Sequence, residues 1–408
     1  MRLLISFAAL FLSVILLQLG AGGVAPLDAL SGAALGFSKS EIGLIGSAHF
    51  FGFFIGCWWA PRLMGEVGHS RAFAAFVAAG TIGILAHMLV IDPIAWGIMR
   101  MASGLCVAGA YTIIEAWLQS KVTNETRGRA MGVYRVVDIT GSLAAQLVIG
   151  VLTPGSYVSY NLLALLLCAA LFPLTLTLTK AEPPETPEAP RLRPAMAWQK
   201  SPLAAAGVIV SGVTGAAFRM VGPMYGLELR LTANEIGIFL AAYVLGGALA
   251  QVPVGWAADK FDRRHVLMGL SLLAIATCLA TVALSGQGAW VNYLSIAAFG
   301  FSTLPIYSVA TAHAHDYATP LERVELSAAL MFLYAVGAIA SPYAASVLIE
   351  YFGASAMFGM IILAHVVLIV FGLGRMRTRP APEQRTAYLD EPRTSFLIGK
   401  LLGRFRDR

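Results

Sequence analysis

Charged side chains inside long apolar runs are the residues of this sequence best placed to do chemistry. If such a run crosses a membrane, each charge costs roughly 2.5–3.5 kcal/mol at mid-bilayer, so it usually faces a polar cavity or another charge. Glu115 lies at the end of the apolar run 94–118. A carboxyl group in an apolar setting can take up and release a proton near neutral pH, which makes Glu115 a candidate for proton coupling. The alternatives are a structural ion pair and a side chain that reaches the polar membrane edge.

A second group of polar residues follows in the next run. Arg135 and Asp138 are three residues apart, and Ser142 and Gln146 continue at helical spacing. These four side chains share one face of a helix, and a polar face in lipid must meet protein or water. The stripe therefore predicts either the wall of a polar cavity or an Arg–Asp pair that locks two helices. A network that also includes Glu115 stays open.

Two further arginines lie within apolar runs. Arg219 follows Gly212 and Gly215, small residues that allow close helix approach. A guanidinium directed into a cavity would attract a carboxylate or phosphate, and the alternative is an ion pair with an acidic residue such as Asp28. Arg100 lies near the outer end of its run, where we expect it to reach the membrane edge.

Tyrosine and histidine offer weaker signals. Tyr111 and Tyr307 are equivalent in an internal repeat described below, so they could line a cavity symmetrically, although packing explains them as well. His313, His315 and Asp316 cluster near the inner end of one run. The spacing places the two imidazoles on different helix faces, which favours a capped helix end over a metal site or a proton relay.

The composition determines which elements must position these residues. Of the 408 residues, 58% are hydrophobic and only 12% are charged, about half the charged share of a soluble domain. Apolar runs of about twenty residues span a bilayer as helices, because every backbone polar group must be paired internally. The runs cover residues 3–27, 41–63, 72–91, 94–118, 130–152, 159–179, 202–227, 236–257, 266–284, 291–312, 325–348 and 355–374.

The break after the sixth run differs from the others. Residues 180–200 are rich in proline and charge and predict a flexible cytoplasmic linker. This linker separates an N-terminal six-helix bundle, 1–179, from a C-terminal one, 201–375, which a basic cytoplasmic tail, 376–408, follows.

Lysine and arginine predict the orientation. If the N-terminus is cytoplasmic, the segments assigned to the outside hold only Lys39 and Arg230 of the 28 basic residues. The positive-inside rule therefore places both termini in the cytoplasm. The net charge of +6 is therefore explained by basic residues in the cytoplasmic segments. For this reason we expect no nucleic-acid partner.

The two halves repeat. Ser38 with Glu41, and Thr232 with Glu235, have the spacing of a capping box at a helix start. Several matches at nearly one offset indicate an internal duplication. At an offset of 196, the matched pairs are Gly104 and Gly300, Tyr111 and Tyr307, Arg127 and Arg323, and Gly141 and Gly337.

Residues 255–264, GWAADKFDRR, resemble the loop signature of the major facilitator superfamily, with Asp262 where the family usually has glycine. The first-half copy is weaker, because Pro61 replaces the usual aspartate. Segments 111–118 and 306–316 are similar to a largely uncharacterised bacterial subgroup, and Gln146 replaces a proline common in drug/proton antiporters. The resemblance assigns a cytoplasmic gate to Asp259, Lys260, Arg263 and Arg264.

The resemblance implies an all-α membrane protein of about twelve transmembrane helices in two pseudo-symmetric six-helix bundles, inserted as a monomer in the bacterial inner membrane. It implies a secondary transporter that moves a small organic solute by alternating access. The carboxyl groups within the apolar runs favour proton coupling, and the embedded arginines favour an anionic or zwitterionic solute. The alternatives are a drug/proton antiporter and a transport-inactive sensor or assembly factor. We expect no enzymatic activity, cofactor or metal. The proton-coupling candidates are Glu115 and Asp138, and the substrate-binding candidates are Arg135, Arg219, Gln146, Tyr111 and Tyr307.

Overall fold

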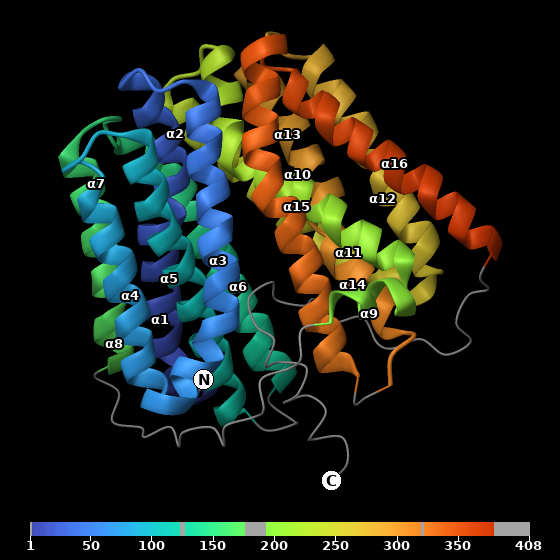
Figure 1. Ribbon diagram of the computed structural model, residues 1–408, viewed down its shortest axis with the longest axis horizontal. Coiled ribbons are helices and arrows are strands. Elements are labelled where there is room, and N and C mark those ends of the chain that lie inside the picture. Colours follow the sequence, from blue (N-terminus) through green and yellow to red (C-terminus); the bar gives the residue numbers. More distant parts are fainter. Residues whose placement is uncertain (1, 123–126, 176–192, 320–321, 379–408) are drawn as a thin grey trace. The chain divides into compact units, whose positions relative to one another are not determined.

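The computed structural model describes residues 2–122, 127–175, 193–319 and 322–378, and the elements within these ranges are helices (Figure 1). They are α1 (Arg2–Gly22), α2 (Val24–Ala34), α3 (Lys39–Val67), α4 (His69–Ala86), α5 (Pro93–Lys121), α6 (Arg127–Val148), the 3-10 helix η1 (Ile149–Val151), α7 (Tyr157–Ala169), α8 (Leu171–Thr175), α9 (Pro194–Lys200), α10 (Pro202–Glu228), α11 (Ala233–Lys260), α12 (Arg263–Ala283), α13 (Ala289–Thr303), α14 (Ile306–His315), α15 (Arg323–Phe352) and α16 (Ala356–Thr378).

Twelve helical stretches of the described chain are long and apolar enough to cross a membrane. Four of them are made of two consecutive elements, namely α1 with α2, α6 with η1, α7 with α8, and α13 with α14. The prediction of about twelve spans is confirmed. Both predicted capping boxes are present, since Ser38 and Glu41 exchange hydrogen bonds at the start of α3, as Thr232 and Glu235 do at the start of α11.

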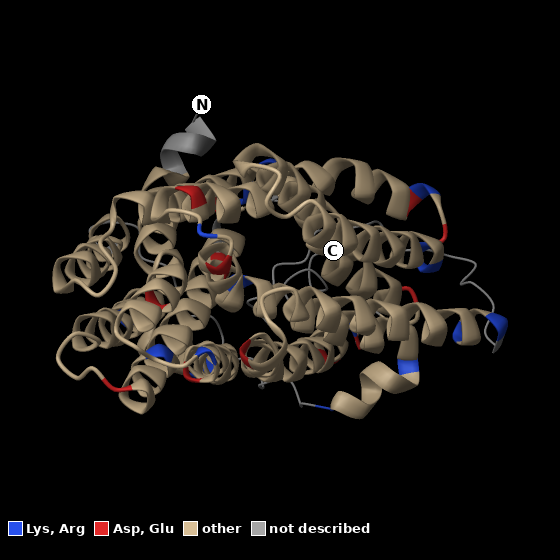
Figure 2. Cartoon of the chain, turned by 90° about the horizontal axis from the view of Figure 1, so that it is seen from above, with Lys and Arg blue, Asp and Glu red and all other residues tan. Residues whose placement is uncertain are grey.

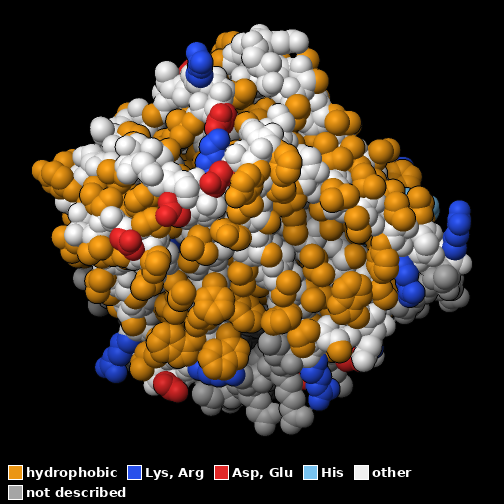
Figure 3. Space-filling model, turned by 45° about the horizontal axis from the view of Figure 1, so that its top comes forward, with side chains coloured by type: hydrophobic (Ala, Val, Ile, Leu, Met, Phe, Trp, Pro, Cys, Tyr) orange, Lys and Arg blue, Asp and Glu red, His pale blue; other side chains and the backbone are white. Residues whose placement is uncertain are grey.

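The outer surface of the helices suits lipid rather than water. Charged residues are sparse along the ribbons in Figure 2, and hydrophobic side chains cover much of the face shown in Figure 3. Val252 of α11 is 81% exposed, and Ile82 of α4 is 67% exposed. Large apolar side chains with this much exposure would lower the solubility of a protein in water, so the solvent around them is hydrocarbon.

The chain forms two compact units. Among the described residues, the first comprises 2–37, 48–122 and 127–175, and the second comprises 38–47, 193–319 and 322–378.

The predicted connecting segments fall mostly outside the described residues. Of the linker predicted at 180–200, residues 180–192 lie outside, and so do residues 379–408 of the predicted tail. The domain boundaries at 179 and 375 therefore stay predictions.

In the first unit, α5 approaches α3 until the two backbones touch. A Cβ atom on Gly104 would overlap the carbonyl oxygen of His49, and one on Gly52 would overlap that of Met101. Only glycine leaves the space that this crossing needs, as in other membrane helix pairs with small residues at the contact.

The second unit repeats this crossing between α11 and α13. A Cβ atom on Gly300 would overlap the carbonyl oxygen of Tyr243, and one on Gly246 would overlap that of Ala297. All four positions are offset by 194 or 196 residues from their counterparts in the first unit. The duplication predicted from the sequence is therefore built into the helix packing, and the two six-helix bundles are pseudo-symmetric.

The short helix α9 is fastened to the second unit by two ion pairs. Lys200 Nζ lies 2.7 Å from a carboxylate oxygen of Glu322, and Arg193 Nη1 lies 3.9 Å from one of Glu325. Met196 and Ala197 are buried on the inner side of α9. The end of the predicted linker is thus attached to the start of α15.

The Lys200–Glu322 contact predicts a pH-dependent stability. Hydrogen bonds from Lys200, with help from Thr319, lower the pKa of Glu322 to about 2 from an ordinary value near 4.5. A lowered carboxyl pKa stabilises the fold above about pH 4.5, and the contribution is lost as the pH falls toward about 2. We expect the melting-temperature difference between wild type and Glu322→Gln to be largest near neutral pH and to shrink between pH 4.5 and the lowest tolerated pH. A difference that stays constant with pH would contradict the assignment.

Candidate functional site

A polar cluster in the first unit is centred on Asp138 of α6. Its Oδ1 atom accepts hydrogen bonds from Gln18 Nε2 of α1 at 2.7 Å and from the Tyr111 hydroxyl of α5 at 2.9 Å. Its Oδ2 atom lies 3.8 Å from Arg135 Nη1. The Asp138 and Arg135 side chains are 18% and 33% exposed, so the cluster is open on one side.

The sequence of α6 explains why these groups meet. Arg135, Asp138, Ser142 and Gln146 are all half-buried along one helical face. Gly141 lies beside them, and a Cβ there would come within 2.9 Å of the Gln18 side chain. The absence of a side chain lets α1 approach the polar face. Gln146 Nε2 also lies 3.5 Å from the carbonyl oxygen of Gly22, so the polar contacts continue along α1.

Glu115 of α5 is buried in the first unit, next to Tyr134 of α6. It is 1% exposed, and its Oε1 atom accepts a hydrogen bond from the Tyr134 hydroxyl at 3.1 Å. Tyr134 directly precedes Arg135 on α6, so this hydrogen bond connects Glu115 to the helix that carries Asp138. The two candidate carboxyl groups therefore occupy contrasting settings, one enclosed and one open.

A second buried cluster surrounds Asp28 of α2. Its Oδ2 atom lies 3.1 Å from Arg100 Nε and 3.6 Å from His87 Nε2, and its Oδ1 atom accepts a hydrogen bond from the Tyr160 hydroxyl at 2.9 Å. All four residues are at most 3% exposed. No spacing rule identifies this cluster, because its members come from four separate segments of the chain.

The Asp28 cluster corrects two sequence-based expectations. Arg100 was expected to reach the membrane edge, yet it is 1% exposed, because the Asp28 carboxylate supplies a counter-charge in the interior. Asp28 was also considered as a partner for Arg219. In the structure, the Asp28 carboxylate forms its ion pair with Arg100.

The two candidate residues of the second unit, Arg219 and Tyr307, have different surroundings. Arg219 is exposed on the otherwise largely buried α10, and no acidic side chain of the described residues lies within ion-pair distance. Tyr307 is 3% exposed and packs edge-on against Tyr334, with 5.3 Å between the ring centroids. Tyr111 and Tyr307 are thus equivalent in the repeat but differ in surroundings, since the former donates a hydrogen bond to Asp138 and the latter packs against Tyr334.

Comparison with known proteins decides the family. A model described as Major Facilitator Superfamily matches the chain twice, over residues 10–211 and 203–407. The chain belongs to the major facilitator superfamily. The double match agrees with the repeat, and superfamily members are transporters, not enzymes.

Curated relatives and solved structures agree with this assignment. An uncharacterized MFS-type transporter of Enterobacter sp. (strain 638) is 25% identical over 345 residues, which are 84% of this chain and 88% of the relative. The uncharacterized MFS-type transporter YcaD of Escherichia coli O7:K1 (strain IAI39 / ExPEC) is 26% identical over 354 residues, 85% of this chain and 89% of the relative. Among solved structures, the nucleoside transporter NupG has a TM-score of 0.73 at 15% identity, with 93% of this chain and 100% of that chain covered. A bacterial homolog of the human lysosomal transporter Spinster has a TM-score of 0.72 at 15% identity, with 92% and 97% covered. These structural similarities establish the major facilitator fold.

The superfamily loop signature between α11 and α12 is held by a buried arginine. Arg263 Nη1 lies 2.7 Å from Asp316 Oδ1 and 2.9 Å from the carbonyl oxygen of Ala312, and its Nη2 lies 3.6 Å from Asp259 Oδ1. The signature therefore connects the start of α12 with the end of α14. Sequence reasoning had assigned Asp316 to a helix end and missed this partnership, because 53 residues separate the two.

The departure from the superfamily signature at Asp262 has a structural reason. Asp262 caps α12 by accepting a hydrogen bond from the Arg264 backbone N–H at 2.9 Å, and its carboxylate lies 2.7 Å from Arg264 Nη2. Burial alone would raise the pKa of Asp262, but the hydrogen bonds from Arg264 lower it below its ordinary value. Lys260, another basic residue of the signature, makes a cation–π contact, with its Nζ atom 4.8 Å from the centroid of the Trp256 ring.

Proposed function

We propose that this chain is a proton-coupled secondary transporter of the bacterial inner membrane, a monomer with both termini in the cytoplasm. It moves a small anionic or zwitterionic solute by alternating access. The observation that carries this proposal is the half-open cluster in which Asp138 is bonded by two neutral donors and lies 3.8 Å from the Arg135 guanidinium.

The geometry links a proton to an anion. The Arg135–Asp138 pair is longer than a hydrogen-bonded ion pair, so it is loose enough to open. A proton on Asp138 removes the negative charge beside Arg135, and the guanidinium then attracts an anionic solute. Because both side chains are partly buried, water screens this exchange of partners less than it would on an open surface, so each ligand favours the binding of the other.

The remaining candidates have supporting roles in this scheme. Tyr111 and Gln146 offer neutral hydrogen-bonding groups beside the Asp138 cluster. Arg219 supplies an exposed guanidinium in the second unit that suits a carboxylate or phosphate. Glu115, enclosed beside Tyr134, is a second proton-accepting group. Tyr307, buried against Tyr334, is assigned to packing.

Asp138→Asn tests the proton role. Protein in liposomes with a trapped pH-sensitive dye should report proton movement when a suitable member of a panel of carboxylates and amino acids is added. Asparagine keeps the shape of the side chain but cannot carry the proton, so we expect solute-dependent proton movement to fall to the background of empty liposomes.

The control is Asp92→Asn, which changes an exposed carboxyl at the start of α5 in the same way. It should move protons as wild type does. If Asp138→Asn also does so, the role assigned to Asp138 is wrong. If amphipathic cations rather than anions elicit proton movement, of opposite direction, the drug/proton antiporter is the better description.

A further inference from the structure

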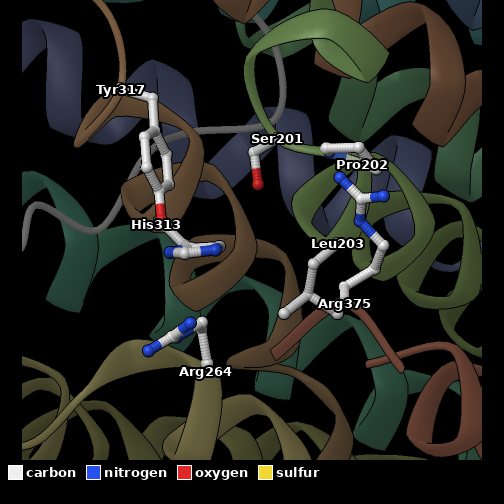
Figure 4. A pocket seen from close by; sticks show the side chains of 7 residues that line it. All are labelled: Ser201, Pro202, Leu203, Arg264, His313, Tyr317 and Arg375. Carbon is white, nitrogen blue, oxygen red and sulfur yellow. The ribbon is translucent and has the colours of Figure 1, made fainter. Parts of the chain in front are cut away.

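A small pocket in the second unit is lined by basic and hydrogen-bonding side chains. It lies where α10, α12, α14 and α16 come together, and it is about 270 Å³ in volume when its open mouth is included. Figure 4 shows the Ser201 hydroxyl and the His313 ring facing the middle of the pocket, with Arg264 and Arg375 on opposite sides of it. His313 is 3% exposed and packs edge-on against Tyr317, with 5.3 Å between the ring centroids.

The charge of this lining has one sign. Arg264 and Arg375 bring two guanidinium groups, and none of the described residues that line the pocket is acidic. The Arg264 guanidinium also donates to the carboxylate of Asp262, outside the lining, from Nε at 3.0 Å and from Nη2 at 2.7 Å, so part of its charge is offset there. The lining therefore offers guanidinium, imidazole and hydroxyl groups, which are the kinds of group that hydrogen-bond a tetrahedral oxyanion.

The backbone adds to this donor set. The pocket meets the first turn of α10, a helix of 27 residues whose N-cap is Ser201. The N-terminus of a long helix carries a partial positive charge and favours anions. This contribution supplements the two arginines and does not replace them.

We propose that the pocket binds a phosphate group. The group belongs either to a free phosphate or to the headgroup of an anionic lipid, since both present the same oxyanion. Basic pockets between transmembrane helices suit lipid headgroups on the cytoplasmic side, and the positive-inside rule assigns this end of the unit to the cytoplasm. The proposal is independent of the transported solute and of the Asp138 cluster.

The test compares two ligands on the full-length protein in detergent. One is inorganic phosphate against potassium chloride at equal ionic strength, and the other is short-chain phosphatidylglycerol against phosphatidylcholine. We expect one of the anionic ligands to raise the melting temperature by at least about 2 °C. Arg375→Gln should abolish the rise, and Arg375→Lys should reduce it, because lysine keeps the charge but loses the bidentate geometry.

The matched control is Arg377→Gln, which removes a charge from the same last turn of α16 at an exposed position outside the pocket lining. It should respond as wild type does. A rise with inorganic phosphate identifies a free phosphate site, and a rise with phosphatidylglycerol alone identifies a lipid headgroup site. If neither ligand raises the melting temperature, or if the rise persists in Arg375→Gln, the proposal is overturned.

Discussion

Alanine in place of Gly300 should destabilise the second unit severely. The added methyl group would overlap the carbonyl oxygen of Tyr243, which is backbone and cannot rotate away. Overpacking typically costs about 1–3 kcal/mol and sometimes more, and a backbone clash lies at the upper end. The melting temperature and the monodisperse yield from detergent should both fall.

The control for Gly300→Ala is Gly269→Ala in α12, where an added Cβ would have no atom within 4 Å. Alanine favours a helix over glycine by about 1 kcal/mol, so this variant should be neutral or slightly stabilised. Gly104→Ala should repeat the damage in the first unit, since it meets His49 as Gly300 meets Tyr243. Equal stability of Gly300→Ala and Gly269→Ala would show that α11 and α13 are not in contact as described.

Removal of the Asp28 charge should have a comparably large effect. Asp28→Asn leaves the Arg100 guanidinium buried without its carboxylate, 3.1 Å away in the wild type. Loss of one partner of a buried ion pair costs about 3–5 kcal/mol. We expect a marked fall in the melting temperature at neutral pH.

The double variant Asp28→Leu with Arg100→Met separates charge from packing. It removes both charges and should recover much of the stability lost in Asp28→Asn, because replacing a buried pair by apolar side chains is often nearly neutral. A single Asp28→Asn variant that melts with wild type would indicate that Arg100 has a sufficient second partner. A double variant less stable than the single one would assign the loss to shape instead of charge.

The features predicted correctly from the sequence are those with local signals. The apolar runs predict the membrane spans. The capping box, which needs only the four residues from Thr232 to Glu235, predicts the start of a helix. The Arg135–Asp138 contact also follows from helical spacing alone. The matched glycines Gly104 and Gly300 occupy equivalent helix contacts, because the two halves of the sequence form two copies of one structure.

The features that sequence reasoning missed depend on contacts between distant segments. Arg100 appeared to lie near a membrane edge because its counter-charge, Asp28, precedes it by 72 residues in another helix. Gln18 of α1 carried no signal that it would bond to Asp138, 120 residues later. Such pairs are set by how helices cross, which side-chain periodicity on one helix does not specify.

The glycine crossings described above each draw both partners from a single unit. The contacts of His49 with Gly104 and of Tyr243 with Gly300 would survive a cut of the polypeptide in the linker predicted at 180–200. The gene should therefore tolerate division into two separately translated fragments, and co-expression of the fragments would supply a means of labelling one half for spectroscopy while the other stays unlabelled.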